Sequence, residues 1–97
     1  MKIEATFEMR QGDREWIGGV TEMNVNTIAQ AQKWVEQEVR RRMRGVKYGS
    51  NRSVEIDVVS LAEIGDFADE EGIPTRSRYL GQYVPMNNEW EWSAHVA

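Results

Sequence analysis

Residues 27–45 read TIAQAQKWVEQEVRRRMRG, and this stretch decides the fold class of the chain. Its apolar side chains recur every three or four residues, the spacing that gathers them on one side of an α-helix. Thr27 and Gln30 have the spacing of a capping box, and Gly45 is a typical C-terminal stop. The stretch therefore predicts one amphipathic helix of roughly 17 residues, whose apolar side must pack against another element.

Strands are predicted on both sides of this helix. Alternating apolar and polar residues at 2–9, a turn, and a returning run at 14–23 indicate a β-hairpin. Gly18 and Gly19, inside the second run, indicate a bulge or a close backbone approach. Alternation at 53–61, 79–84 and 89–96 predicts further strands. The acidic segment 66–71 is expected to form a single helical turn before Gly72 and Pro74.

The resulting order is strand, strand, helix, strand, short acidic helical turn, strand, strand. This order predicts an α+β fold, a mostly antiparallel β-sheet of about five strands with one long helix packed on one face. The residues expected to be buried are Ile3, Phe7, Ile28, Trp34, Val35, Val39, Val54, Ile56 and Val58. If all strands share one sheet, its opposite face is acidic and carries Glu4, Glu8, Glu55, Asp57, Glu89 and Glu91.

The composition limits the class of protein. Its 97 residues fit a single domain, 1–97, and a chain with 40% apolar and 29% charged residues is typical of a globular protein. The absence of cysteine excludes disulfides, thiolate catalysis and cysteine-based zinc sites. No apolar run approaches the roughly 18 residues of a membrane span, and the first ten residues lack a signal-peptide core. We therefore expect a cytoplasmic protein that does not interact with a membrane.

Catalytic chemistry is not indicated by the sequence. His95 is the one side chain suited to proton transfer near neutral pH, and no nucleophile motif surrounds it. The acids at 66–71 lack the spacing of a calcium loop, and Gly18-Gly19 lacks that of a phosphate-binding loop. We expect no enzyme activity, no cofactor, no metal site and no small-molecule substrate.

The formal net charge of −4 conceals an uneven distribution. Residues 33–52 carry seven basic and two acidic side chains, whereas residues 53–97 carry two basic and nine acidic ones. One interpretation is that the acids simply line solvated strand faces and turns. The other interpretation is that the acids imitate the phosphates of a nucleic acid. Carboxylates two residues apart on a β-strand lie about 6.6 Å apart, which is close to the distance between successive phosphates of one nucleic-acid chain. Such a decoy would bind a basic groove and lose affinity with added salt.

The end of the helix suggests a different partner. Arg40, Arg41, Arg42 and Arg44 could contact phosphates, with the nearby Tyr48 stacking on a base. The same arginines also suit the negative end of the helix dipole. A small nucleic-acid-binding module is therefore the alternative function, or the cluster is a secondary basic contact for a protein partner.

The C-terminal tryptophans allow a third interpretation. Trp90 and Trp92 alternate with Glu89 and Glu91, which predicts core positions for the two rings. An exposed Trp90 flanked by carboxylates would instead be an anchor for a protein partner. A generic interaction subunit that assembles through this terminal strand is the remaining alternative.

The layout resembles the small anti-CRISPR proteins of phages and other mobile elements, most of all the inhibitors of type I-F surveillance complexes. The features that carry the resemblance are the hairpin at 2–23, the helix opening at Thr27, the strand at 53–61 and the acidic, Trp-bearing end at 88–97. The resemblance implies inhibition without catalysis inside a bacterial host cell, by a protein that occupies the DNA-binding groove of the CRISPR-Cas complex. The phosphate surrogates would be Glu63, Asp66, Asp69, Glu70 and Glu71 with Glu89 and Glu91, and Trp90 would be a packing or anchor residue. We therefore expect a protein partner and no direct contact with nucleic acid.

Overall fold

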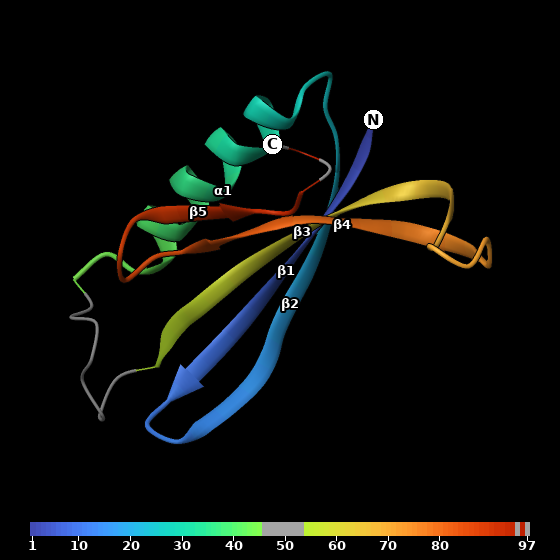
Figure 1. Cartoon of the computed structure of the whole chain (residues 1–97). Helices are drawn as coiled ribbons and strands as arrows, with labels where there is room; N and C mark the ends of the chain where they lie inside the picture. The colour runs from blue at the N-terminus through green and yellow to red at the C-terminus, as the bar shows by residue number, and fades with distance from the viewer. Residues whose placement is uncertain (46–53, 95, 97) are drawn as a thin grey trace.

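The computed structural model describes residues 1–45, 54–94 and 96, and shows one helix lying on a five-stranded sheet (Figure 1). The elements in chain order are β1 (Lys2–Gln11), β2 (Arg14–Asn24), α1 (Ile28–Arg42), β3 (Glu55–Ala68), β4 (Pro74–Val84) and β5 (Glu89–Trp92). All neighbouring strands are antiparallel, and their spatial order is β2-β1-β3-β4-β5. The predicted α+β fold with a mostly antiparallel sheet of five strands is confirmed, and all strands share one sheet.

Helix α1 begins at the predicted cap and has 15 residues, slightly fewer than expected. The Gln30 N–H donates to Thr27 Oγ1 at 3.2 Å, and Gln30 Oε1 accepts from the Asn26 N–H at 2.7 Å. The first bond is the N-cap half of the predicted capping box, whereas the Gln30 side chain bonds the N–H of Asn26, one residue before the cap, and not that of Thr27. The helix ends at Arg42, so its last turn holds three arginines near the negative end of the dipole. No helix in the described part of the chain is long and apolar enough to cross a membrane.

The core lies between α1 and one face of the sheet. Ile3, Ala5 and Phe7 on β1 have no accessible surface, and neither do Ala31 and Val35 on the facing helix. The edge of the Phe7 ring meets Trp34, with ring centroids 6.2 Å apart. Of the residues expected to be buried, Ile3, Phe7, Val35, Val39 and Ile56 are buried, whereas Ile28 and Trp34 are half-buried. The prediction for Val54 is wrong: it precedes β3, pairs with no strand, and is 42% exposed.

A bulge in β3 changes which residues face the helix. The pairing of β1 with β3 shifts between Glu8 and Met9, so that Val58 lies opposite Glu8 and Ile56 opposite Met9. The extra residue, Asp57, breaks the alternation. Ile56 and Val59 are therefore both in the core, and Val58 is half-buried on the opposite face, which corrects its predicted burial.

The glycine pair in β2 produces the expected irregularity. The pairing of β1 with β2 shifts between Phe7 and Glu8, which leaves Gly18 as the extra residue. A Cβ atom at Gly18 would overlap the side chain of Met9, whereas one at Gly19 would meet nothing within 4 Å. The predicted bulge and close approach are both confirmed at Gly18.

Strands β3 and β4 extend beyond the rest of the sheet as a two-stranded arm, defined here as residues 65–78 (Figure 1). The last residue of β3 that pairs with β1 is Ile64, opposite Lys2. The prediction of a helical turn at 66–71 is wrong, because residues 66–68 continue β3 and residues 69–73 form the turn of the hairpin. The Asp69 carboxylate accepts the N–H groups of Glu71 and Ile73 at 2.9 and 2.8 Å, and the Asp69 N–H donates to the Ile73 carbonyl. These bonds favour a hairpin turn over a helical one.

Strand β5 is shorter than predicted, ending at Trp92 rather than near residue 96. It pairs with residues 81–84 of β4, where Gly81 has a φ of +156°. A Cβ atom at Gly81 would lie 2.6 Å from the Glu91 carbonyl oxygen and 2.9 Å from the Trp92 ring. Glycine is required here because the backbone conformation and the close approach of β5 both exclude a side chain. His95, predicted on the polar face of this strand, lies outside the described residues.

Candidate interaction surfaces

The arm carries most of the acids predicted to be phosphate surrogates, but in different environments. Asp66, Glu70 and Glu71 are exposed and form no ion pair with any described residue. Asp69 is exposed too, and its carboxylate closes the turn. Glu63, at the base of the arm, accepts from the Arg78 guanidinium at 2.7 Å, so its charge is compensated. Three freely presented carboxylates and one turn-forming carboxylate therefore remain near the end of the arm.

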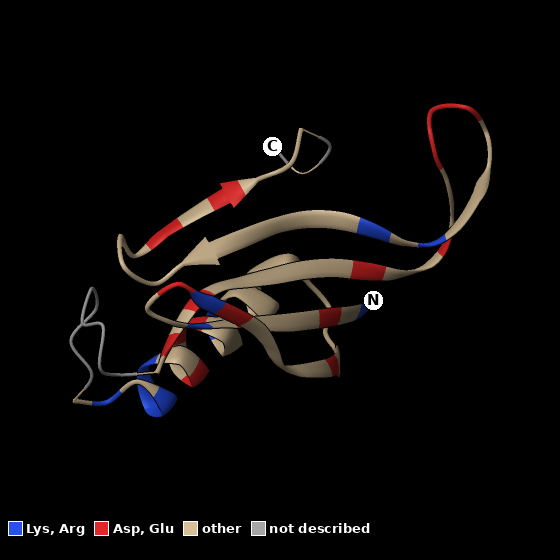
Figure 2. Ribbon diagram, turned by 90° about the horizontal axis from the view of Figure 1, so that it is seen from below, with Lys and Arg blue, Asp and Glu red and all other residues tan. Residues whose placement is uncertain are grey.

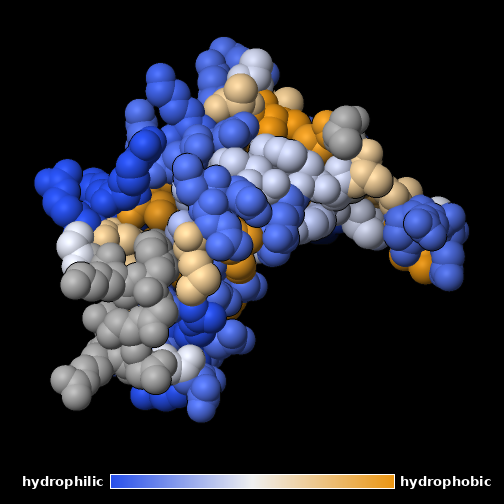
Figure 3. All heavy atoms as spheres, turned by 60° about the vertical axis from the view of Figure 1, so that its left-hand side comes forward, coloured by the Kyte–Doolittle hydropathy of each residue, from blue (hydrophilic) through white to orange (hydrophobic). Residues whose placement is uncertain are grey.

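Side-chain contacts hold the arm in shape. The Arg78 guanidinium lies 4.6 Å from the centroid of the Phe67 ring while it pairs with Glu63 on the opposite strand. In the space-filling view the arm stands out from the body of the molecule, and its end is hydrophilic (Figure 3). Ile73, 55% exposed, adds an apolar side chain to the acidic turn.

The sheet face opposite α1, called here the open face, carries the other predicted acids. Residues directly opposite one another on antiparallel strands share a face, so the pairings define its members. They are Glu4, Thr6 and Glu8 on β1, Ile17, Val20 and Glu22 on β2, Val58, Ser60 and Ala62 on β3, Tyr79 and Gln82 on β4, and Glu91 on β5. Glu89, two residues before Glu91, lies on the same face. This arrangement agrees with the expected acidic face at Glu4, Glu8, Glu89 and Glu91.

Glu55 and Asp57 depart from that expectation. Glu55 is 3% exposed, and its carboxylate accepts from Arg10 at 2.7 Å; Asp57 lies 3.3 Å from the same guanidinium. The pKa of Arg10 is raised, first by the hydrogen bond to Glu55 and then by the charge of Asp57. A buried carboxylate needs such a partner, because desolvation of an unpaired charge is costly. Both acids are therefore compensated by Arg10; Glu55 is removed from the accessible acidic surface, whereas Asp57 is half-buried.

The structure separates the predicted decoy residues into two groups (Figure 2). The turn of the arm adjoins Pro74 at the start of β4, whereas Glu89 and Glu91 pair with residues 84 and 82 at its end. Thr75 and Gln82 are seven positions apart on β4, which corresponds to roughly 23 Å along the strand. The arm and β5 therefore present two acidic surfaces instead of one continuous array.

The predicted basic cluster at the end of α1 is partly neutralised. Arg41 and Arg42 both donate to Glu38, Arg42 at 2.7 Å, and the two hydrogen bonds lower the pKa of the Glu38 carboxyl. The Arg42 guanidinium also lies 4.2 Å from the centroid of the Phe7 ring. Arg40 and Arg44 are exposed and form no ion pair with the described residues. Within this cluster, Arg40 and Arg44 are therefore the arginines that no described carboxylate engages.

Trp90 and Trp92 point toward the helix side of the sheet. Their rings stack with centroids 4.7 Å apart, and the Tyr83 ring lies 5.1 Å from Trp90. Both indoles are half-buried and pack against the core, as the alternation predicted. Trp90 thus faces away from Glu89 and Glu91, and only part of its surface is open to a partner. Its buried indole nitrogen has no hydrogen-bond partner among the described residues.

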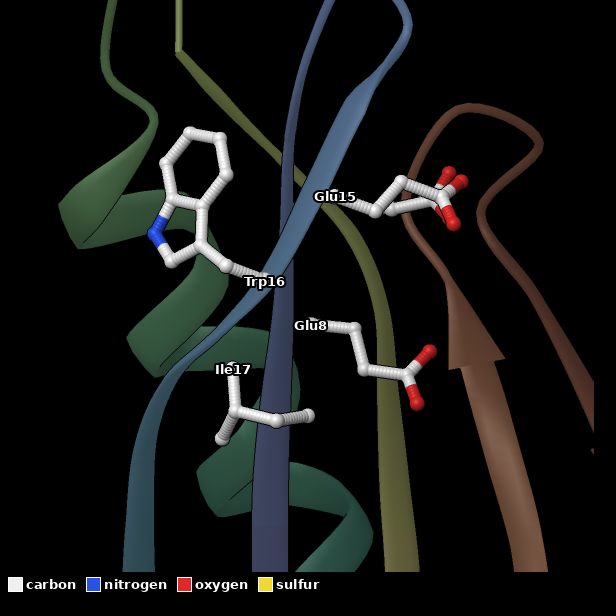
Figure 4. Close-up of a pocket in the computed structure, with 5 residues that line it drawn as sticks. Glu8, Glu15, Trp16 and Ile17 are labelled. Carbon is white, nitrogen blue, oxygen red and sulfur yellow. The ribbon is translucent and has the colours of Figure 1, made fainter.

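Two hollows in the surface of the described residues adjoin candidate side chains. One, of about 250 Å³, is lined by Glu8, Glu15, Trp16, Ile17 and Asp57; the carboxylates of Glu8 and Glu15 extend to the same side, and the Trp16 ring to the other side of β2 (Figure 4). The other, of about 330 Å³, is lined by Val39, Arg40, Met43, Tyr83, Pro85 and Asn88. Among the described residues no group of three or more acidic side chains is arranged to hold a metal ion.

The sequence interpretation missed the apolar side chains of the open face. Ile17 and Val20 are 57% and 54% exposed, although alternation alone places apolar residues of β2 toward the helix. The Gly18-Gly19 pair could have indicated this exposure. A bulge between Ile17 and Val20 places these two residues on the same face although they are three positions apart.

The comparisons with known proteins add no relative. No family model matches the chain, and no curated protein and no solved structure is significantly similar to it.

Proposed function

We propose that this chain is a non-enzymatic inhibitor that inserts its acidic arm into the basic groove of a nucleic-acid-binding protein complex and keeps nucleic acid out. The observation that carries the proposal is the arm itself, a projecting hairpin with Asp66, Glu70 and Glu71 exposed and free of ion pairs with described residues. The resemblance in layout to inhibitors of type I-F surveillance complexes makes the DNA-binding groove of such a complex the first target to test.

The shape of the arm supports this role. A two-stranded ribbon that extends past its sheet can enter a groove that a compact face cannot reach. The contacts of Arg78 with Glu63 and Phe67, and the turn closed by Asp69, order the arm before it binds. An element ordered in advance loses less conformational entropy on binding, which favours affinity.

The charge of the arm sets the kind of partner. Exposed carboxylates near the turn attract a surface of lysines and arginines, and the attraction acts mainly on the rate of association and weakens with salt. The basic end of α1 lies away from the turn of the arm (Figure 2). Its arginines therefore do not neutralise the acids that would enter the groove.

The test is a pull-down with a purified type I-F surveillance complex, with and without target DNA, at low and high salt. We expect binding that target DNA excludes and that high salt weakens. The double variant Glu70→Lys/Glu71→Lys should weaken binding by about tenfold or more, equivalent to about 1.4 kcal/mol. Asp13→Lys/Glu36→Lys changes the net charge equally at sites away from the arm, and should bind better than the arm variant.

Three outcomes would overturn parts of this proposal. An equal loss in both double variants would show that net charge, not the arm, determines binding. No binding of the complex at any salt concentration would exclude this target. A gel shift of free DNA that Arg40→Ala/Arg44→Ala abolishes would favour the alternative, a nucleic-acid-binding module that uses the end of α1.

A further inference from the structure

We infer that the open face is a second docking surface, and that its occupant is an extended protein segment in which Lys or Arg side chains alternate with apolar ones. This inference goes beyond the proposed inhibition and does not depend on the arm. It rests on the apolar content of the open face, on its uncompensated acids, and on the spacing that the strand pairing gives them.

The open face is more apolar than a solvated sheet face requires. An antiparallel sheet covered on one side normally shows polar residues on the other. Here Ile17, Val20 and Tyr79 are 57%, 54% and 48% exposed, and they extend from β2 to β4. Between them lie Glu4, Thr6 and Glu8 on β1 and the half-buried Val58 and Ala62 on β3. Apolar side chains on both sides of the carboxylates of β1 favour a protein partner that is itself partly apolar.

The pairings show how these side chains are arranged. One row crosses all five strands in the order Val20, Thr6, Ser60, Gln82, Glu91. The next row contains Glu22, Glu4, Ala62 and Tyr79, and the row on the other side contains Ile17, Glu8 and Val58. Small and apolar side chains thus occupy the middle of the face, and carboxylates lie in every row.

Glu91 accepts a hydrogen bond from Gln82 Nε2 at 2.8 Å, and the other carboxylates of these rows are poorly compensated. Glu4 lies directly opposite Glu22, a pairing of like charges that destabilises a sheet, and the Lys2 ammonium contacts Glu22 alone at 3.2 Å. Glu8 forms no ion pair with the described residues. Arg10, at the end of this face, is already held by Glu55 and Asp57. A cationic occupant would reduce the repulsion between these carboxylates, which the cations of the protein itself leave largely in place.

The aromatic side chain on this face experiences the same negative charge. The pKa of Tyr79 is raised, first by desolvation and then by the charges of Glu91 and Glu8, which approach it from β5 and β1. Carboxylates from strands on either side of β4 therefore both act on Tyr79. Such a concentration of negative charge excludes a second copy of the open face as the favoured occupant, because like surfaces repel.

The spacing of Glu4 and Glu8 selects an extended segment. They are four residues apart on β1, which corresponds to about 13 Å, with Thr6 between them on the same face. An extended segment along β1 carries residues i and i+4 at the same spacing, with residue i+2 above Thr6. Cationic residues at i and i+4 and an apolar residue at i+2 would match this strand. The hollow of about 250 Å³ beside Glu8 and Glu15 can receive one cationic head group (Figure 4).

The test is a fluorescence-anisotropy titration with a labelled synthetic peptide of three Lys-Thr-Val-Thr repeats, which places lysines four residues apart on one side. Two control peptides are used: one with glutamate in place of lysine, and one of the same composition with its lysines consecutive. We expect saturable binding of the first peptide, none of the glutamate peptide, and weaker binding of the consecutive-lysine peptide.

Two matched variants locate the binding site on the protein. Glu4→Gln/Glu8→Gln should weaken peptide binding by about tenfold, equivalent to about 1.4 kcal/mol. Glu70→Gln/Glu71→Gln removes the same charge from the arm and should weaken peptide binding less than Glu4→Gln/Glu8→Gln does, because the arm attracts cations but lacks the spacing of the open face. Because both variants replace exposed or half-buried carboxylates with amides of the same shape, circular dichroism should show both folded.

The possible results separate this inference from the proposed inhibition. A loss of peptide binding in the arm variant alone would place the peptide on the arm and overturn the inference. Equal binding of the consecutive-lysine peptide, an absence of saturable binding, or a stable dimer in sedimentation that buries this face would also overturn it. Loss of binding to the surveillance complex does not bear on the open face, since that binding is assigned to the arm.

Discussion

Along β1, successive side chains alternate between two faces with opposite properties. Ile3, Ala5 and Phe7 have no accessible surface under α1, whereas Glu4 and Thr6, between them, are half-buried on the open face. The same strand therefore contributes to the stability of the core through one set of residues and to a candidate binding surface through the other. Substitutions on this one strand should therefore divide sharply into those that unfold the protein and those that alter its contacts.

The largest effect is expected at Phe7. Replacing Phe7 by Ala removes a fully buried ring that contacts Trp34 and lies under the Arg42 guanidinium. We expect Phe7→Ala to lower the free energy of unfolding by about 3–5 kcal/mol, measured by urea denaturation. The control Thr6→Ala, one residue away on the open face, should lower it by about 1 kcal/mol or less. Similar losses in the two variants would contradict the division between the faces.

A smaller, pH-dependent effect is expected at the end of α1. Glu38 has a pKa lowered by hydrogen bonds from Arg41 and then Arg42, so its charged form is favoured in the folded state. Its contribution to stability is fully present above the unfolded-state pKa of 4.5 and is lost as the pH falls through the lower folded-state pKa. At neutral pH, Glu38→Gln should lower the free energy of unfolding by about 0.5 kcal/mol, because the arginine partners are exposed.

The measurement is the free energy of unfolding of both proteins as the pH is lowered from neutrality. The wild-type protein should lose its advantage over Glu38→Gln at acidic pH. Two parallel pH profiles would show that the ion pairs of Glu38 do not stabilise the helix end.

The smallest effect on stability is expected on the open face. Ile17→Thr/Val20→Thr replaces two side chains that are more than half exposed with another β-branched residue. We expect a change in the free energy of unfolding within about 0.5 kcal/mol for each substitution. Binding of the lysine-containing peptide should weaken, most visibly at high salt, where the charge attraction is screened. Unchanged peptide affinity would show that only the carboxylates contribute to the open face.

The parts of the fold that depend on neighbours in sequence could be predicted. The helix cap at Thr27, the alternation along β1 and the bulge at Gly18 all depend on a few adjacent residues, and all are present in the structure. The course of residues 66–71 was not predictable in this way. There the Asp69 side chain competes with helix formation, and long-range pairing extends β3 and β4 into an arm.

Among the candidate site residues, the sequence identified the acids but not their environments. Glu63 is paired with Arg78, and the exposed carboxylates of the arm lie far along β4 from Glu89 and Glu91. These differences arise from partners that are 15 or more positions away in the chain, which periodicity does not report. Arg40 and Arg44 differ from Arg41 and Arg42 for a more local reason, since only the latter two lie within reach of Glu38.

The sequence by itself determined the α+β class, the helix and its cap, the first hairpin and part of the core, because each follows from a periodicity that local backbone geometry imposes. Only the tertiary structure decided on which face of the sheet Val58 lies, that Glu55 is buried, and that the arm projects from the sheet. A single bulge residue, Asp57, reverses the alternation that follows it, and the position of that residue is set by pairing with β1 across the sheet.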